Sequence, residues 1–127
     1  MNTFLFNERY EMDIIMSATS SYIMVKGTPG HAGTDVEGLD EALKGKKETF
    51  LAIIDALGFM LDGGVITKKQ GSFSVCEPVG APGRHLVLQA YLFPTDVLTL
   101  LREIAGFKVV SSAALPTGSI VWTMERH

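Results

Sequence analysis

Two segments of the chain place apolar residues at the spacing of an amphipathic helix. In residues 46–57, Phe50, Ile53, Ile54 and Leu57 recur at this spacing, and in residues 94–105, Val97, Leu100, Leu101 and Ile104 do so. Spacings of three and four residues predict one buried helical face in each segment. Each helix is followed by a glycine and a phenylalanine, at 58–59 and 106–107. Because a left-handed glycine commonly ends a helix, this repeat predicts two similar helix-to-strand corners.

Segments rich in β-branched and aromatic residues predict the strands. These segments cover residues 21–26, 65–67, 73–76, 85–93, 109–115 and 119–125. Residues 68–71 connect the second and third segments, and Pro116, Thr117 and Gly118 connect the last two. Both pairs of segments are therefore predicted to form hairpins.

A capping pattern predicts a further helix start. Thr34 is followed three residues later by Glu37, and such a pair can satisfy free amides in the first turn of a helix. Gly38 and Gly45 weaken the segment that follows, by about 1 kcal/mol each relative to alanine. We therefore expect either one bent helix or a short helix followed by the firm helix at 46–57.

The order of predicted elements indicates an α+β fold. The 127 residues, 46% of them hydrophobic, suffice for a single domain over residues 1–127 with a core of its own. Strands outnumber the two helices, which favours a two-layer structure: an antiparallel or mixed sheet with both helices on one face. As an architecture this is similar to ferredoxin-like folds.

Charge and cysteine content exclude several classes of function. The net charge is −3, and the densest basic run is Lys44, Lys46 and Lys47, so nucleic-acid binding is disfavoured. Cys76, the single cysteine, cannot form an internal disulfide, and a catalytic role for it lacks a recognisable partner. Residues 1–9 lack the pattern of a signal peptide, and no apolar stretch approaches the roughly 20 residues of a membrane span. We therefore expect a cytoplasmic protein that binds neither nucleic acid nor membrane.

The strand at 85–93 bears on assembly because both of its faces are mostly apolar. One face carries Leu86, Leu88, Ala90 and Leu92, and the other carries Val87, Gln89, Tyr91 and Phe93. A sheet with helices on one side is usually polar on the other. We expect the second face to pack on a second subunit as a homodimer. The alternative is that the N-terminal segment around Phe4, Phe6, Ile14 and Ile15 covers it.

Four large side chains are candidates for binding a small molecule. If their strands adjoin, Tyr22, Met24, Tyr91 and Trp122 would line one patch of the sheet. Such a patch suits an apolar or aromatic ligand that a few polar groups orient. The alternative is that these residues form core or dimer contacts.

Two Pro-Gly loops carry the remaining candidates. His31 lies in residues 27–31, and Arg84 and His85 lie in the similar residues 80–85. If the loops meet, a histidine would serve as acid or base, with Arg84 binding an anionic group. Gly30, His31, Gly33 and Thr34 would bind an anion at the predicted helix start. The alternatives are ordinary surface histidines and a merely tight connection.

The sequence predicts no cofactor, and no spacing of histidine or cysteine suggests a metal site. Its leading interpretation is a non-catalytic, homo-oligomeric binding or interaction protein that holds an apolar or aromatic small molecule against its sheet. The alternative is a cofactor-independent enzyme on a dimeric α+β frame, with His31 or His85 as the acid or base.

Overall fold

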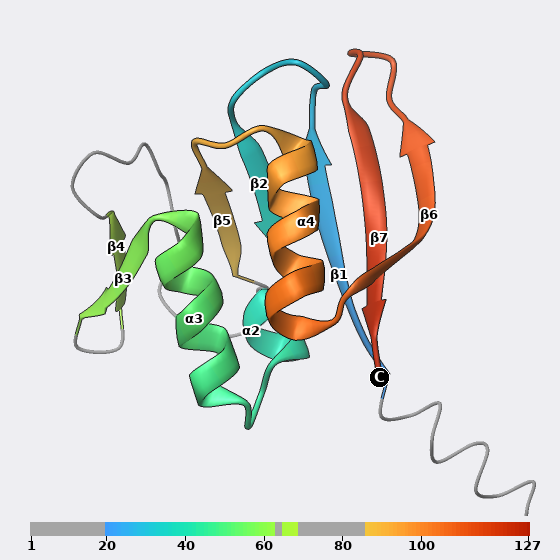
Figure 1. Cartoon of the computed structure of the whole chain (residues 1–127). Helices are drawn as coiled ribbons and strands as arrows, with labels where there is room; N and C mark the ends of the chain where they lie inside the picture. The colour runs from blue at the N-terminus through green and yellow to red at the C-terminus, as the bar shows by residue number, and fades with distance from the viewer. Residues whose placement is uncertain (1–19, 63–64, 69–85) are drawn as a thin grey trace, which may run out of the picture.

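The computed structural model describes residues 20–62, 65–68 and 86–127, and these form an α+β structure. An antiparallel sheet of five strands, in the order β5-β2-β1-β7-β6, carries α3 and α4 on one face (Figure 1). The strands are β1 (Ser21–Gly27), β2 (Thr34–Glu37), β5 (Val87–Ala90), β6 (Lys108–Ala114) and β7 (Ile120–Arg126). The helices are α2 (Leu39–Ala42), α3 (Lys47–Leu57) and α4 (Pro94–Ala105), and a separate hairpin pairs β3 (Phe59–Asp62) with β4 (Val65–Lys68).

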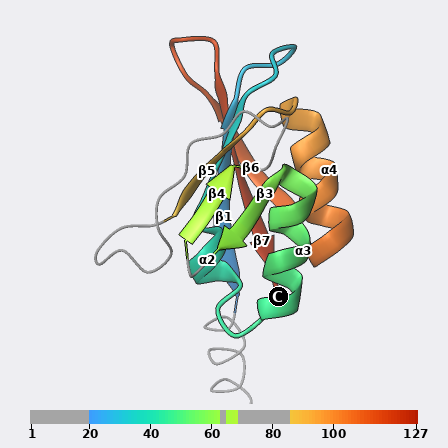
Figure 2. The same ribbon diagram turned by 90° about the vertical axis from the view of Figure 1, so that its left-hand side faces the viewer.

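Strand β1 lies at the centre of the sheet and defines its two faces. Ile23 and Val25 are buried under the helices, whereas Tyr22, Met24 and Lys26 point to the other side because side chains alternate along a strand. Figure 2 shows α3 and α4 together on one side of the sheet. We call the side beneath α3 and α4 the covered face, and the opposite side the open face.

The core lies between the covered face and the two longer helices. The sheet contributes buried aliphatic side chains, namely Ile23, Val25, Val36, Leu88, Ala90 and Met124. The helices contribute Phe50, Ile53, Ile54 and Leu57 from α3, and Val97, Leu101 and Ala105 from α4. These are largely the positions at which the helical period predicted a buried face, although Leu100 and Ile104 are only partly buried.

Most elements predicted from periodicity are confirmed. The strand at 21–26, the helices at 46–57 and 94–105 and the final hairpin appear within a residue or two of their predicted bounds. Gly58 and Gly106 both adopt the left-handed conformation after their helices, with φ of 96° and 77°. The α+β class is therefore confirmed. A ferredoxin-like arrangement is not, because β1 and β2 pair directly, whereas that fold places a helix between its first two strands.

The predicted helix start at Thr34 is wrong, because residues 34–37 form strand β2. The backbone amides and carbonyls of these residues form hydrogen bonds with β1 on one side and with β5 on the other. A capping box would have satisfied only amides within the same segment. The hydroxyl of the buried Thr34 donates to the carbonyl of Leu92 at 2.8 Å instead of capping a helix. The chain enters α2 only after Gly38, which has a φ of 88°. Of the two alternatives for the following segment, a short helix and then a firm one is observed.

The middle of the chain differs in part from its prediction. The strand at 65–67 is confirmed, and among the described residues it pairs with β3. Its predicted partner at 73–76 lies outside the described residues, as does His85. The strand predicted over 85–93 is shorter, since β5 ends at Ala90 and α4 begins at Pro94.

Candidate functional site

The open face of the sheet is mixed rather than apolar. Cross-strand register places Glu37 and Thr123 beside Met24, Asp35 and Val121 beside Lys26, and Glu125 beside Tyr22. The expectation of a mostly apolar second face is wrong for the sheet as a whole, because β2 and β7 bring carboxylates onto it. A dry face-to-face contact between subunits would bury these charges at considerable cost unless each found a partner.

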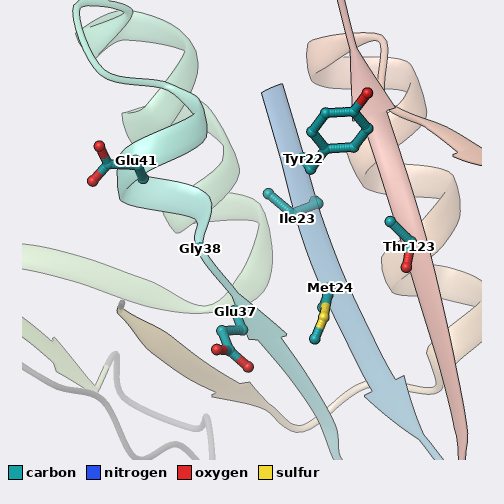
Figure 3. A pocket seen from close by; sticks show the side chains of 7 residues that line it. All are labelled: Tyr22, Ile23, Met24, Glu37, Gly38, Glu41 and Thr123. Carbon is teal, nitrogen blue, oxygen red and sulfur yellow. The ribbon is translucent and has the colours of Figure 1, made fainter. Parts of the chain in front are cut away.

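One end of the open face contains an open hollow of about 380 Å³. It lies between β1 and the segment that leads from β2 into α2 (Figure 3). Its lining residues come from four elements and one connection: Tyr22, Ile23, Met24, Glu37, Gly38, Glu41 and Thr123. The volume lies within the range of small-molecule pockets, roughly 300–1,000 Å³.

The hollow follows from two local features of the chain. Strand alternation turns Tyr22 and Met24 outward together, and their side chains are 57% and 43% exposed. The left-handed Gly38 redirects the chain so that α2 lies against the start of β1. A Cβ atom at Gly38 would lie 3.7 Å from the Tyr22 carbonyl oxygen, so the connection runs close to β1. Tyr22 and Met24 therefore form the base of the hollow, and the segment from Gly38 into α2 forms its side.

A hydrogen bond fixes the Tyr22 ring at the edge of this hollow. The Tyr22 hydroxyl donates to Glu125 Oε2 at 2.9 Å. That bond, followed by the negative charge of Glu125 and slight desolvation, raises the pKa of Tyr22 above its ordinary value of 10.0. The phenol is therefore neutral at physiological pH and keeps donating. The other Glu125 oxygen lies 3.5 Å from His127 Nε2, while His127 Nδ1 lies 3.0 Å from the Ser20 hydroxyl.

The side chains around the hollow suit the binding of a positively charged group. Tyr22 and Met24 offer apolar and polarisable surface, and the carboxylates of Glu37 and Glu41 lie at the rim (Figure 3). An aromatic face and nearby carboxylates both attract a positive group. Among the residues that the structure describes, the charged side chains that line the hollow are the carboxylates of Glu37 and Glu41.

The four predicted ligand residues do not share one surface. Tyr22 and Met24 lie together in the hollow. Trp122 lies opposite Val25 in the register, so it points to the covered face, where it is half-buried against the core. Tyr91 lies just beyond β5, 59% exposed, and is not part of the hollow. Strand alternation therefore separates Trp122 from the two residues of β1, although β1 and β7 adjoin.

The predicted loop candidates are only partly within the described residues. His31 is exposed in the loop between β1 and β2, and its amide donates to the Thr28 carbonyl at 3.0 Å. Gly30 and Gly33 both have positive φ, and the Gly33 amide donates to the Leu92 carbonyl at 3.0 Å. Since Thr34 begins a strand, the free helix amides expected for an anion are absent at this position. Arg84 and His85 lie outside the described residues, so their convergence with His31 stays a prediction.

The hollow includes residues that sequence reasoning missed. Glu37, Gly38 and Glu41 were assigned to one predicted helix, and this hid the close approach of their segment to β1. Thr123 lies on the open face because side chains alternate along β7 and Trp122 takes the covered face. Its position beside Met24 depends on the register between β7 and β1, which no local pattern of the chain expresses.

Comparison with known proteins found no matching family model, curated protein or solved structure. Every helix in the described part of the chain is too short or too polar to cross a membrane. Within residues 20–62, 65–68 and 86–127, no three histidine, cysteine, aspartate or glutamate side chains gather as a metal site would require. The site is thus defined by its own geometry, as an aromatic and acidic hollow on the open face of an α+β sheet.

Proposed function

We propose that the protein is a non-catalytic binding protein whose ligand is a small apolar or aromatic molecule with a positively charged group. The observation that carries this proposal is the hollow in which Tyr22 and Met24 lie exposed side by side, with Glu37 and Glu41 at its rim. The ligand would cover the two large side chains and place its cation near the carboxylates.

Energetic considerations support a ligand of modest affinity. Removing apolar surface from water contributes about 25 cal/mol per Å², and a cation over an exposed aromatic ring adds about 0.5–1 kcal/mol. Because the hollow is open to solvent, the carboxylates are screened and each contributes at most about 1 kcal/mol. The proposed ligand therefore has both an apolar body and a charge, since neither contribution alone gives strong binding.

Self-association is the second part of the proposal. The charged open face argues against the face-to-face dimer expected from the sequence, but a contact elsewhere on the sheet would leave the hollow accessible. We therefore propose a homo-oligomeric binding module whose subunits meet outside the hollow.

Three indole compounds test the ligand class by isothermal titration calorimetry. Tryptamine, tryptophol and indole-3-acetate carry the same ring with a positive, neutral and negative substituent. We expect affinity to decrease in that order, because the rim carboxylates attract the first compound and repel the last. Equal affinities would contradict the role of charge, and no binding by any of the three would overturn the proposed ligand class.

Variants locate the site. Tyr22→Ala should abolish measurable tryptamine binding, whereas Tyr91→Ala, which removes an equally exposed tyrosine outside the hollow, should leave it unchanged. Glu37→Gln should weaken tryptamine about twofold to fivefold, since an exposed charge interaction contributes at most about 1 kcal/mol. Tryptophol affinity should not change in that variant. Tryptamine binding that survives Tyr22→Ala would place the site elsewhere.

A further inference from the structure

Strand β6 lies at the edge of the sheet and is not covered by the helices. All seven of its residues are exposed, including Val109 and Val110 at 47% and 50%. Strand β7 pairs with one side of β6, and among the described residues no strand pairs with the other side. In Figure 1, β6 forms the outer edge of the sheet, away from α3. A long edge strand of this kind presents unpaired amides and carbonyls to another chain.

The strand has few of the features that usually block edge pairing. Lys108 at its start is the only charged residue in the sequence Lys-Val-Val-Ser-Ser-Ala-Ala, and the strand has no proline. The register shifts between Val109 and Ser111, so residues 111–114 form a regular run beyond that irregularity. The opposite edge strand, β5, has only four residues, two of which are buried. The two edges of the sheet are therefore unequal, and β6 is the one suited to pairing.

We propose that β6 pairs antiparallel with β6 of a second copy of this chain about a two-fold axis through residues 111–114. This inference rests on the self-association proposed above and names its surface. A strand that pairs with itself must not place like charges opposite each other. In β6 the regular run contains only serine and alanine, and antiparallel pairing keeps the two Lys108 side chains at opposite ends of the contact.

The edge contact is also compatible with the ligand site. Strand β7 separates β6 from β1, so pairing at the edge leaves Tyr22 and Met24 uncovered. It extends the sheet of each copy without burying Glu37 or Glu125, which a face-to-face contact would bury. A contact of one strand pair falls below the roughly 1,200 Å² of stable interfaces, and we therefore expect reversible association at high protein concentration.

Opposite charges at Ser112 test the pairing. Ser112 is exposed on β6. Because the proposed two-fold axis passes through residues 111–114, Ser112 of one copy would lie opposite Ser112 of the other or within a few residues of it along the paired strand. Ser112→Lys and Ser112→Asp should each weaken self-association at least about tenfold, as like charges meet across the axis. An equimolar mixture of the two variants should associate again. Sedimentation velocity over a concentration series measures self-association of the wild-type protein, of each variant and of the mixture.

Matched controls separate the pairing from general charge effects. Thr95→Lys and Thr95→Asp introduce the same charges at an exposed position of α4 and should leave association unchanged. Association that persists in both Ser112 variants would overturn the β6 contact and leave self-association standing. Wild-type protein that stays monomeric throughout would overturn both. A mixture that fails to associate would also overturn the proposed pairing, provided that circular dichroism shows each variant folded.

Discussion

The chain contains two segments in which a helix ends at a glycine and continues through a phenylalanine into a hairpin, but the two hairpins lie in different parts of the fold. Helix α3 ends at Gly58 and continues through Phe59 into the β3–β4 hairpin, while α4 ends at Gly106 and continues through Phe107 into β6–β7. Both glycines are left-handed and both phenylalanines are buried. The corners are alike because a helix end is determined by a few neighbouring residues.

The two hairpins differ in what they pair with. Strand β7 pairs with β1 along all seven residues of both strands, which makes its hairpin part of the main sheet. The β3–β4 hairpin has four-residue strands, and among the described residues these pair only with each other. Arg126 of β7 also donates from Nε to the Ala105 carbonyl at 2.6 Å, which satisfies the end of α4. One corner thus leads into the centre of the fold and the other into a peripheral hairpin.

The largest expected difference between the two segments comes from their phenylalanines. Phe107→Ala should lower the free energy of unfolding by about 3–5 kcal/mol, as buried Phe-to-Ala changes do. Phe59→Ala should cost clearly less in global unfolding, because the separate hairpin can open while the main sheet stays folded. Trp122, the only tryptophan, lies in β7 and reports the main sheet during urea unfolding. Equal losses of unfolding free energy in the two variants would show that the β3–β4 hairpin unfolds only together with the main sheet.

Hydrogen exchange sharpens that comparison. In Phe59→Ala, amides of β3 should lose protection while those of β1 keep theirs. In Phe107→Ala, amides of β1 and β7 should lose protection together. Loss of protection throughout the chain in both variants would contradict the separation of the hairpins.

Replacing the glycine at either corner should lower the free energy of unfolding by equal amounts, and by less than Phe107→Ala does. Gly58→Ala and Gly106→Ala each force a residue with a Cβ into a left-handed conformation, at roughly 1–2 kcal/mol. Both α3 and α4 supply core residues, so urea unfolding should register both losses through Trp122. Asparagine tolerates this conformation better, so Gly58→Asn and Gly106→Asn should lose less. A marked inequality between the two alanine variants would mean that the corners are not equivalent.

The smallest effect concerns the link between Glu125 of β7 and Tyr22 of β1. Because the pKa of Tyr22 is raised in the folded state, folding favours the neutral phenol. This contribution is fully present below pH 10 and is lost as the pH rises through the folded pKa. Ultraviolet titration of phenolate should show that the pKa of Tyr22 is raised, and Glu125→Gln should lower that pKa. An upward-shifted tyrosine that persists in Tyr22→Phe would contradict the assignment of the shift to Tyr22.

Local patterns of the sequence determined the two long helices, their glycine ends and the final hairpin. These features depend on contacts between residues close in sequence, such as the apolar period of residues 46–57 and the turn at Pro116, Thr117 and Gly118. Each of these predictions required only the conformation of one segment.

The tertiary structure alone decided that residues 34–37 form a strand rather than the start of a helix, and it alone decided where the hollow lies. Thr34 and Glu37 match a helix cap locally, yet pairing with β1 and β5 on both sides outweighs that preference. Tyr22 and Met24 were named from the sequence, but Glu37 and Glu41 came beside them only through strand register and the turn at Gly38. Backbone pairing between distant segments leaves little trace in local composition, which is why the sequence predicted the elements and only the folded sheet assembled the site.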